Sequence, residues 1–141
     1  MMFSRNKEMK MKNICIFLLI FYTSSLLAEL PPYVYDQLKH SATEDVVIEV
    51  KKVRTSFFAI HDQDVNIEAR VVTVRHSERG LKVGDTIAVF YIHEIRQAGM
   101  VGPSTLPVLH ENKIYHAYLT FDDVGKKYIP AARGQSFEPL E

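Results

Sequence analysis

Apolar and polar residues alternate along most of the chain after residue 44, and this alternation is typical of half-buried β-strands. In the segment 45–60, Val46, Ile48 and Val50 fall on one face, with the intervening residues on the other. Pro130, in the last such segment, lacks a backbone N–H and predicts that this strand lies at an edge. Five strands are predicted in all, at 45–60, 65–74, 86–95, 113–121 and 127–132.

Two local features indicate that the predicted strands coil into a barrel. The apolar phase shifts by one residue between Val72 and Val74, as a β-bulge would cause, and bulges bend strands. Gly80 and Gly84 then supply residues that adopt positive φ in the turn before the next strand. The pattern predicts an all-β fold, a small five-stranded OB-like barrel. The alternatives are a jelly-roll fragment or an immunoglobulin-like sandwich, although the latter usually has about seven strands.

Three segments lie outside the predicted strands or extend beyond them: an N-terminal stretch, a long connection and the closing segment. Pro31 and Pro32 begin a stretch in which Val34, Tyr35 and Leu38 recur at helical spacing, which predicts a short helix or an irregular arm. The Gly/Pro-rich connection 97–112 is long for a compact domain, so it is either a crossover or a binding loop. We expect the closing segment, YIPAARGQSFEPL, to pack along a barrel edge, or else to dock a partner.

The first 28 residues have the pattern of a secretory signal peptide. Four basic residues, an uncharged run over 14–22 and a short segment of small residues ending at Ala28 follow one another. The wider apolar stretch 14–28 falls short of the roughly 20 residues that a spanning helix needs. We therefore expect cleavage after Ala28, a domain over 29–141 and a periplasmic or secreted protein. A leader retained as an anchor, as in an inner-membrane assembly factor, is the alternative.

Cysteine content and net charge limit how the mature domain is stabilised and which partners it binds. The single cysteine, Cys15, lies in the predicted signal, so the mature chain has none and its fold must rely on burial without disulfides. The whole chain has 17 basic and 17 acidic residues, and the first 28 contain four of the basic and one of the acidic residues, which leaves a mature charge of about −3. Because no basic stripe is present, we expect no nucleic-acid partner.

The strand motifs resemble the netrin-like and tissue-inhibitor-of-metalloproteinase-like OB domains. The similarity runs from Ala42 to Leu119, through ATEDVVIEVKKV, ARVVTVRHSERGLKVGDTIAVFY and PVLHENKIYHAYL. The resemblance implies an exported OB-like barrel used for binding. In the inhibitors an N-terminal cysteine chelates the zinc of the target protease. This mature chain begins at Glu29 and has no such cysteine, so protease inhibition and the family's functional residues are not transferred.

The histidines are the candidates for metal chemistry. The segment HEIRQ, from His93 to Gln97, lacks the second histidine of an H-E-x-x-H site. If the loops that carry them met in space, four side chains would form a divalent-ion site: His61, Asp64, His110 and His116. This metal site defines the alternative function, a small exported metal-binding protein or metal-dependent enzyme.

No motif predicts catalysis, and we expect no cofactor. The segment around Ser104 lacks the second glycine of a nucleophile elbow. Asp122 and Asp123 are expected in a hairpin turn, since the pattern of a calcium loop is incomplete. Phe57 and Phe58 lie near the end of the predicted strand 45–60, where alternation exposes one of them, and an exposed aromatic residue there favours a partner surface. The predicted binding residues are therefore Phe57, Phe58, Met100, Pro103, Ser104 and Leu106.

The sequence as a whole predicts an exported, non-enzymatic binding module. Its ligand is expected to be a protein or a cell-envelope component, recognised by the connection around Gly99–Asn112 together with His61–Asp64. After cleavage no membrane span is expected. The sequence does not indicate the oligomeric state.

Overall fold

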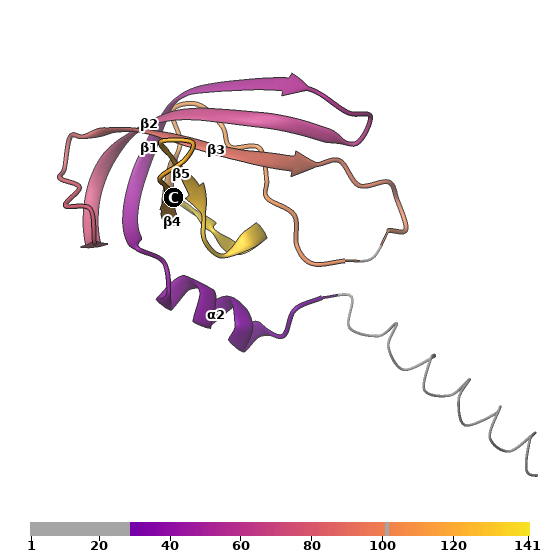
Figure 1. The fold of residues 1–141 in the computed structure, drawn as a ribbon, viewed down its shortest axis with the longest axis horizontal. Helices are drawn as coiled ribbons and strands as arrows, with labels where there is room; N and C mark the ends of the chain where they lie inside the picture. Colours follow the sequence, from indigo (N-terminus) through magenta and orange to yellow (C-terminus); the bar gives the residue numbers. More distant parts are fainter. Residues whose placement is uncertain (1–28, 101) are drawn as a thin grey trace, which may run out of the picture.

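Five strands close into a barrel in the computed structural model, which describes residues 29–100 and 102–141 (Figure 1). Neighbouring strands pair in the order β1-β2-β3-β5-β4, and pairing between β1 and β4 closes the ring. All pairs are antiparallel except β3 with β5. The strands are β1 (Glu44–Phe57), β2 (Asp62–Ser77), β3 (Thr86–Glu94), β4 (Ile114–Asp122) and β5 (Lys127–Pro130). The predicted OB-like barrel is therefore confirmed. The predicted signal peptide lies outside the described residues.

Bulges let the two longest strands wrap around the barrel. Val47 pairs with Thr73 and Ile48 with Val71, so Val72 is the extra residue of β2. The phase shift in the sequence predicted a bulge here, and the register confirms it. A bulge adds local twist, which allows a single strand to pair with neighbours on both sides of a small barrel. Accordingly, β1 pairs with β2 along its length and with β4 over Glu44–Glu49.

The predicted N-terminal segment forms a helix, α2 (Pro32–His40), against one end of the barrel (Figure 1). Pro32 lies at the first helical position, where its missing N–H costs no intrahelical bond. Tyr35 is the buried residue of the helix. Within the described residues, no helix is both long and apolar enough to cross a membrane.

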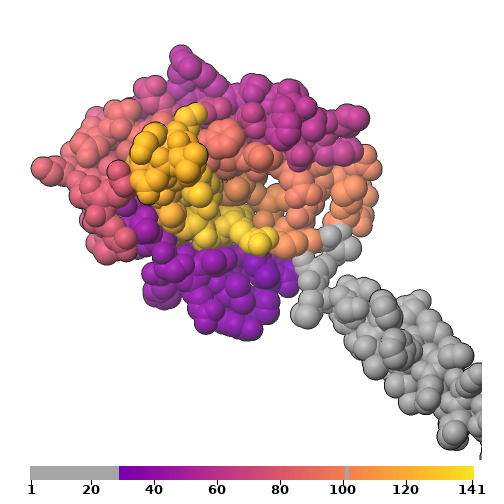
Figure 2. Space-filling view, in the orientation of Figure 1, coloured from indigo at the N-terminus to yellow at the C-terminus, as the bar shows by residue number. Residues whose placement is uncertain are grey.

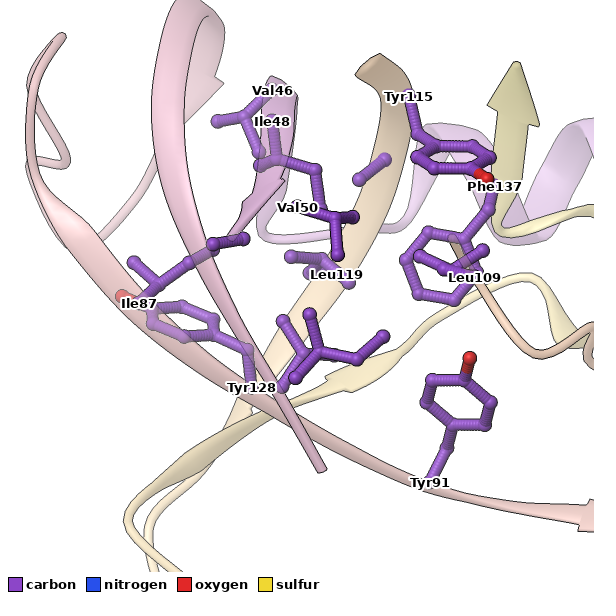
Figure 3. Packing of buried hydrophobic residues seen from close by; sticks show 14 of the residues in the cluster. Val46, Ile48, Val50, Ile87, Tyr91, Leu109, Tyr115, Leu119, Tyr128 and Phe137 are labelled. Atoms are coloured by element: carbon purple, nitrogen blue, oxygen red, sulfur yellow. The ribbon is translucent and has the colours of Figure 1, made fainter. Parts of the chain in front are cut away.

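Alternating inward side chains fill the barrel interior, as the periodicity predicted. Val46, Ile48 and Val50 of β1 are fully buried. Of the two residues between them, Val47 is also buried and Glu49 is partly buried. Figure 3 shows these aliphatic side chains between an Ile87–Tyr128 group on one side and a more aromatic group on the other. The second group comes from β3, β4, β6 and the segment before β4, and it consists of Tyr91, Leu109, Tyr115 and Phe137.

The C-terminal segment differs in one respect from the prediction. β5 lies between β3 and β4, so the edge position predicted from Pro130 is wrong. The proline is tolerated because it is the last residue of β5, and the next N–H, that of Ala131, bonds the Tyr118 carbonyl at 2.9 Å. After a 3-10 turn, η1 (Arg133–Gln135), strand β6 (Phe137–Leu140) pairs outside the barrel with β4. The tail thus covers an edge, as expected.

One acidic side chain is buried at the start of β1. Glu44 is fully buried, and one carboxylate oxygen accepts a hydrogen bond from the Arg79 backbone N–H at 3.2 Å. Its second oxygen, Oε2, has no hydrogen-bond partner within the described part of the chain. The carboxyl therefore ties β1 to the turn between β2 and β3.

Candidate ligand-binding hollow

A hollow lies where the segment 95–113, which contains the predicted connection 97–112 and is called the connection from here on, passes the end of β3 and the turn η1. Its volume is about 570 Å³, within the range of small-ligand sites. Figure 2 shows the surface hollowed among the orange residues of the connection. We call it the loop hollow; its lining comprises Ile92, Glu94, Arg96, Met100, Gly102, Pro103, Ser104, Thr105, Leu106, Arg133 and Gly134.

Two side chains of β3 hold the connection in place. The Tyr91 hydroxyl donates a hydrogen bond to the Pro107 carbonyl at 2.6 Å. His93 Nδ1 lies 2.6 Å from the Leu106 carbonyl, and because a carbonyl can only accept, Nδ1 must carry the proton. Burial raises the pKa of the Tyr91 hydroxyl well above its usual range, which keeps it a donor. The connection is thus anchored to a barrel strand, and the hollow is preformed.

A close contact between η1 and the connection forms one wall of the hollow. A Cβ at Gly134 would lie 2.7 Å from the carbonyl carbon of Ser104 and 2.6 Å from its Oγ, so only glycine fits there. Arg133, just before it, has a φ of 49°, in the left-handed region that residues other than glycine rarely adopt. The turn η1 therefore packs directly on the connection and points Arg133 into the lining.

The start of the described chain also contacts the connection. The Tyr35 hydroxyl donates to Glu29 Oε1 at 2.5 Å and accepts from the Ser104 hydroxyl at 3.0 Å. The Ser104 backbone N–H donates to the same Glu29 oxygen at 3.2 Å. α2 therefore holds Ser104 through a buried tyrosine, and a carboxylate already occupies the Ser104 amide at the rim.

The hollow carries two guanidinium groups and one carboxylate. Arg96 Nη2 lies 3.4 Å from Glu94 Oε2, which is a long contact through a single nitrogen. The Arg96 guanidinium lies over Gly102, where a Cβ would approach both terminal nitrogens to 3.1 Å. Arg133 makes no ion pair within residues 29–100 and 102–141. Apart from these three charged groups, the lining is apolar, hydroxylic or glycine.

The predicted binding residues divide into two groups. Met100, Pro103, Ser104 and Leu106 all line the loop hollow. Phe57 and Phe58 lie instead at the β1–β2 hairpin tip, with 69% and 60% of their surface exposed.

The hairpin tip is beside the start of the connection. The Ile95 N–H donates to the His61 carbonyl at 2.7 Å. The sequence predicts that the loop 61–64 and the connection bind the ligand together. The loop does contact the first residue of the connection, but no residue of 61–64 lines the hollow.

The structure does not bring the four predicted metal ligands together. Across residues 29–100 and 102–141, no three histidine, cysteine or acidic side chains are grouped as a metal ion would require. His61 lies in the hairpin, Asp64 in β2 and His110 in the connection. His116 is buried in β4, and its Nε2 lies 2.5 Å from an Asp45 carboxylate oxygen.

His116 belongs to a separate polar cluster that joins four elements. Its Nδ1 lies 3.5 Å from Glu138 of β6, and Lys39 of α2 donates to that glutamate at 2.6 Å. Burial, reinforced by the charges of Glu138 and Asp45, raises the pKa of Tyr118 beside them. The side chains bond one another, so the cluster fastens α2 and β6 to the barrel. No sequence pattern predicts this cluster beyond the polar positions of Asp45 and Glu138.

Sequence reasoning missed the arginines and the supports of the hollow. Arg96 and Arg133 belong to no motif, and their proximity follows from the barrel bringing the end of β3 beside η1. Tyr91 and Gly134 likewise act through contacts with residues distant in sequence. The Arg-Gly pair after Pro130 was the one available signal, since glycine marks close backbone approach.

Comparison of the chain with family models, with curated proteins and with solved structures finds no match.

Proposed function

We propose that this protein is an exported, non-enzymatic binding module whose ligand, a protein or cell-envelope component, enters the loop hollow. The observation that carries the proposal is the convergence of Met100, Pro103, Ser104 and Leu106 on one preformed hollow. The sequence predicts all four as binding residues. Export rests on the signal-like pattern of residues 1–28.

Anchoring of the connection supports binding at this place. Long loops are costly to order, and a loop that is already fixed by Tyr91, His93 and Tyr35 loses little entropy when a ligand arrives. Exposed apolar side chains at the rim, Met100 and Ile92, offer surface that a ligand would bury.

The netrin-like resemblance is part of the same proposal. The OB-like barrel agrees with the fold of those domains, and the proposal takes from them only the general use of the barrel as a binding scaffold. The proposal uses the hollow and not the histidines, because His116 is already bonded to Asp45.

Affinity capture with the full chain, tagged after Glu141, tests the proposal. Met100→Asp places a charge on the rim, where the side chain is 55% exposed, and we expect at least a tenfold loss of material captured from the native cell envelope. Val83→Asp is the matched control, because Val83 is an equally apolar, exposed residue of the β2–β3 turn outside the lining. Equal capture by both variants, at unchanged circular dichroism, contradicts the proposal.

A further inference from the structure

We propose that the loop hollow selects a ligand that presents a carboxylate next to an apolar group, with Arg133 and Arg96 receiving the carboxylate. This inference rests on the proposed binding function and adds the chemical class of the ligand. It is carried by the charges, the exposure and the contacts of the lining residues.

Two guanidinium groups face the hollow, although the chain around it is acidic overall. Arg96 and Arg133 line it together with the carboxylate of Glu94. The rim carboxylate of Glu29 already accepts hydrogen bonds from Tyr35 and the Ser104 amide. The segment 29–141 as a whole carries about −3. Arginine side chains grouped on an otherwise acidic domain attract anions to that place on its surface.

Arg96 keeps donors free for a ligand. Its side chain is only 24% exposed, so the guanidinium is held in position with little motion left to lose. Its contact with Glu94, at 3.4 Å, uses one terminal nitrogen. A guanidinium has five N–H donors in a planar fork that matches a carboxylate, so most of its hydrogen-bonding capacity is unused within residues 29–100 and 102–141.

Arg133 is presented by an unusual backbone. Its φ of 49° is uncommon for a residue with a side chain, and such conformations persist where the surroundings enforce them. Here the Arg133 carbonyl accepts hydrogen bonds from the Ser136 hydroxyl at 2.7 Å and the Ser136 N–H at 3.0 Å, and Gly134 packs closely on Ser104. Arg133 is exposed, has no ion-pair partner in the described residues, and belongs to the part of the lining that η1 contributes.

The apolar part of the lining determines which chemical group the ligand carries beside its carboxylate. Ile92, Met100, Pro103 and Leu106 are apolar, so a ligand that fills the hollow must bury apolar surface beside its charge. The protein itself already places carboxylates at this rim, Glu29 on the Ser104 amide and Glu94 on Arg96. Two sources share the inferred chemistry, the C-terminal residue of a polypeptide and a free organic acid with an apolar chain.

Calorimetric titration of the full chain with three probes tests the inference. The probes are acetyl-Leu-Phe with a free C-terminal carboxylate, the same dipeptide as its C-terminal amide, and decanoate. We expect at least one carboxylate probe to bind, and the amide to bind the protein at least tenfold more weakly than the acid if the source is a polypeptide. Binding of decanoate without the dipeptide assigns the site to free acids.

Arginine variants locate the carboxylate. Arg133→Gln and Arg96→Gln are each expected to lower the affinity for the binding probe about tenfold, while Arg54→Gln, an exposed arginine of β1 outside the lining, leaves it unchanged. Two arginine variants are used so that a folding defect in one does not decide the result.

The two proposals fail in different ways. If capture by the full chain is sensitive to Met100→Asp but no carboxylate probe binds, or the arginine variants bind like the parent, only the carboxylate inference is overturned. If capture is insensitive to Met100→Asp as well, the hollow itself is not the binding site and both proposals are overturned.

Discussion

The Tyr91 hydroxyl donates a 2.6 Å hydrogen bond to the Pro107 carbonyl, which joins the barrel to the connection that forms the loop hollow. Tyr91→Phe removes the donor and leaves the carbonyl without that partner. We expect the free energy of unfolding to fall by about 1 kcal/mol, measured by urea denaturation. Tyr33→Phe, at an exposed tyrosine of α2, is the control and should change little. Equal effects of the two changes would show that the bond does not support the connection.

Alkaline pH should destabilise the fold. Burial raises the pKa of Tyr91 and of Tyr128 in the folded protein, and tyrosine in the unfolded chain titrates near about 10. Below that pH both states are protonated and the stabilisation is complete. Above it the folded state retains the protons that the unfolded state loses, so the free energy of unfolding falls as pH rises. Urea titrations from pH 8 to pH 11 measure this, and Tyr91→Phe should flatten the decline.

Gly134 should not tolerate a side chain. Gly134→Ala places a methyl group 2.6 to 2.7 Å from Ser104, including its backbone, so the connection or η1 must move. We expect a loss of roughly 1–3 kcal/mol in the free energy of unfolding and weaker ligand capture. Denaturation and capture measured on the same preparation test both effects. Full stability together with full capture would mean that this contact is easily relaxed.

The Asp45–His116 contact should couple two strands. Asp45→Asn, His116→Ala and the double variant form a thermodynamic cycle, and we expect a coupling energy of about 1–3 kcal/mol because the bond involves a charged group and a buried ring. Ligand capture should be unaffected, since neither residue lines the loop hollow. A coupling near zero would assign the attachment of β1 to β4 to their backbone pairing and core packing alone.

The hairpin aromatics should matter for binding more than for stability. Phe57 and Phe58 are largely exposed, so Phe57→Ser with Phe58→Ser should change the free energy of unfolding by less than about 0.5 kcal/mol per site. We expect weaker capture of the envelope ligand, because the hairpin adjoins the start of the connection through Ile95. Undiminished capture would confine the binding surface to the hollow.

The sequence by itself determined the elements and the faces of the strands. Alternation is a local property of a strand, so Val46, Ile48 and Val50 could be assigned to one buried face before any partner was known. The bulge at Val72 and the positive φ at Gly80 and Gly84 are also local, because they follow from phase and from the absence of a Cβ. These features were enough to predict a small barrel and the connection that lines its hollow.

Only the tertiary structure decided which strands meet and which side chains share a site. Pro130 is compatible with an edge or with a strand end, and the closure of β5 between β3 and β4 selected the second. His116 could have been a metal ligand, but the pairing of β1 with β4 places it against Asp45. Arg96 and Arg133 face one hollow because barrel closure brings η1 to the end of β3. Periodicity encodes the direction of a side chain, whereas its neighbours depend on long-range pairing that no local pattern specifies.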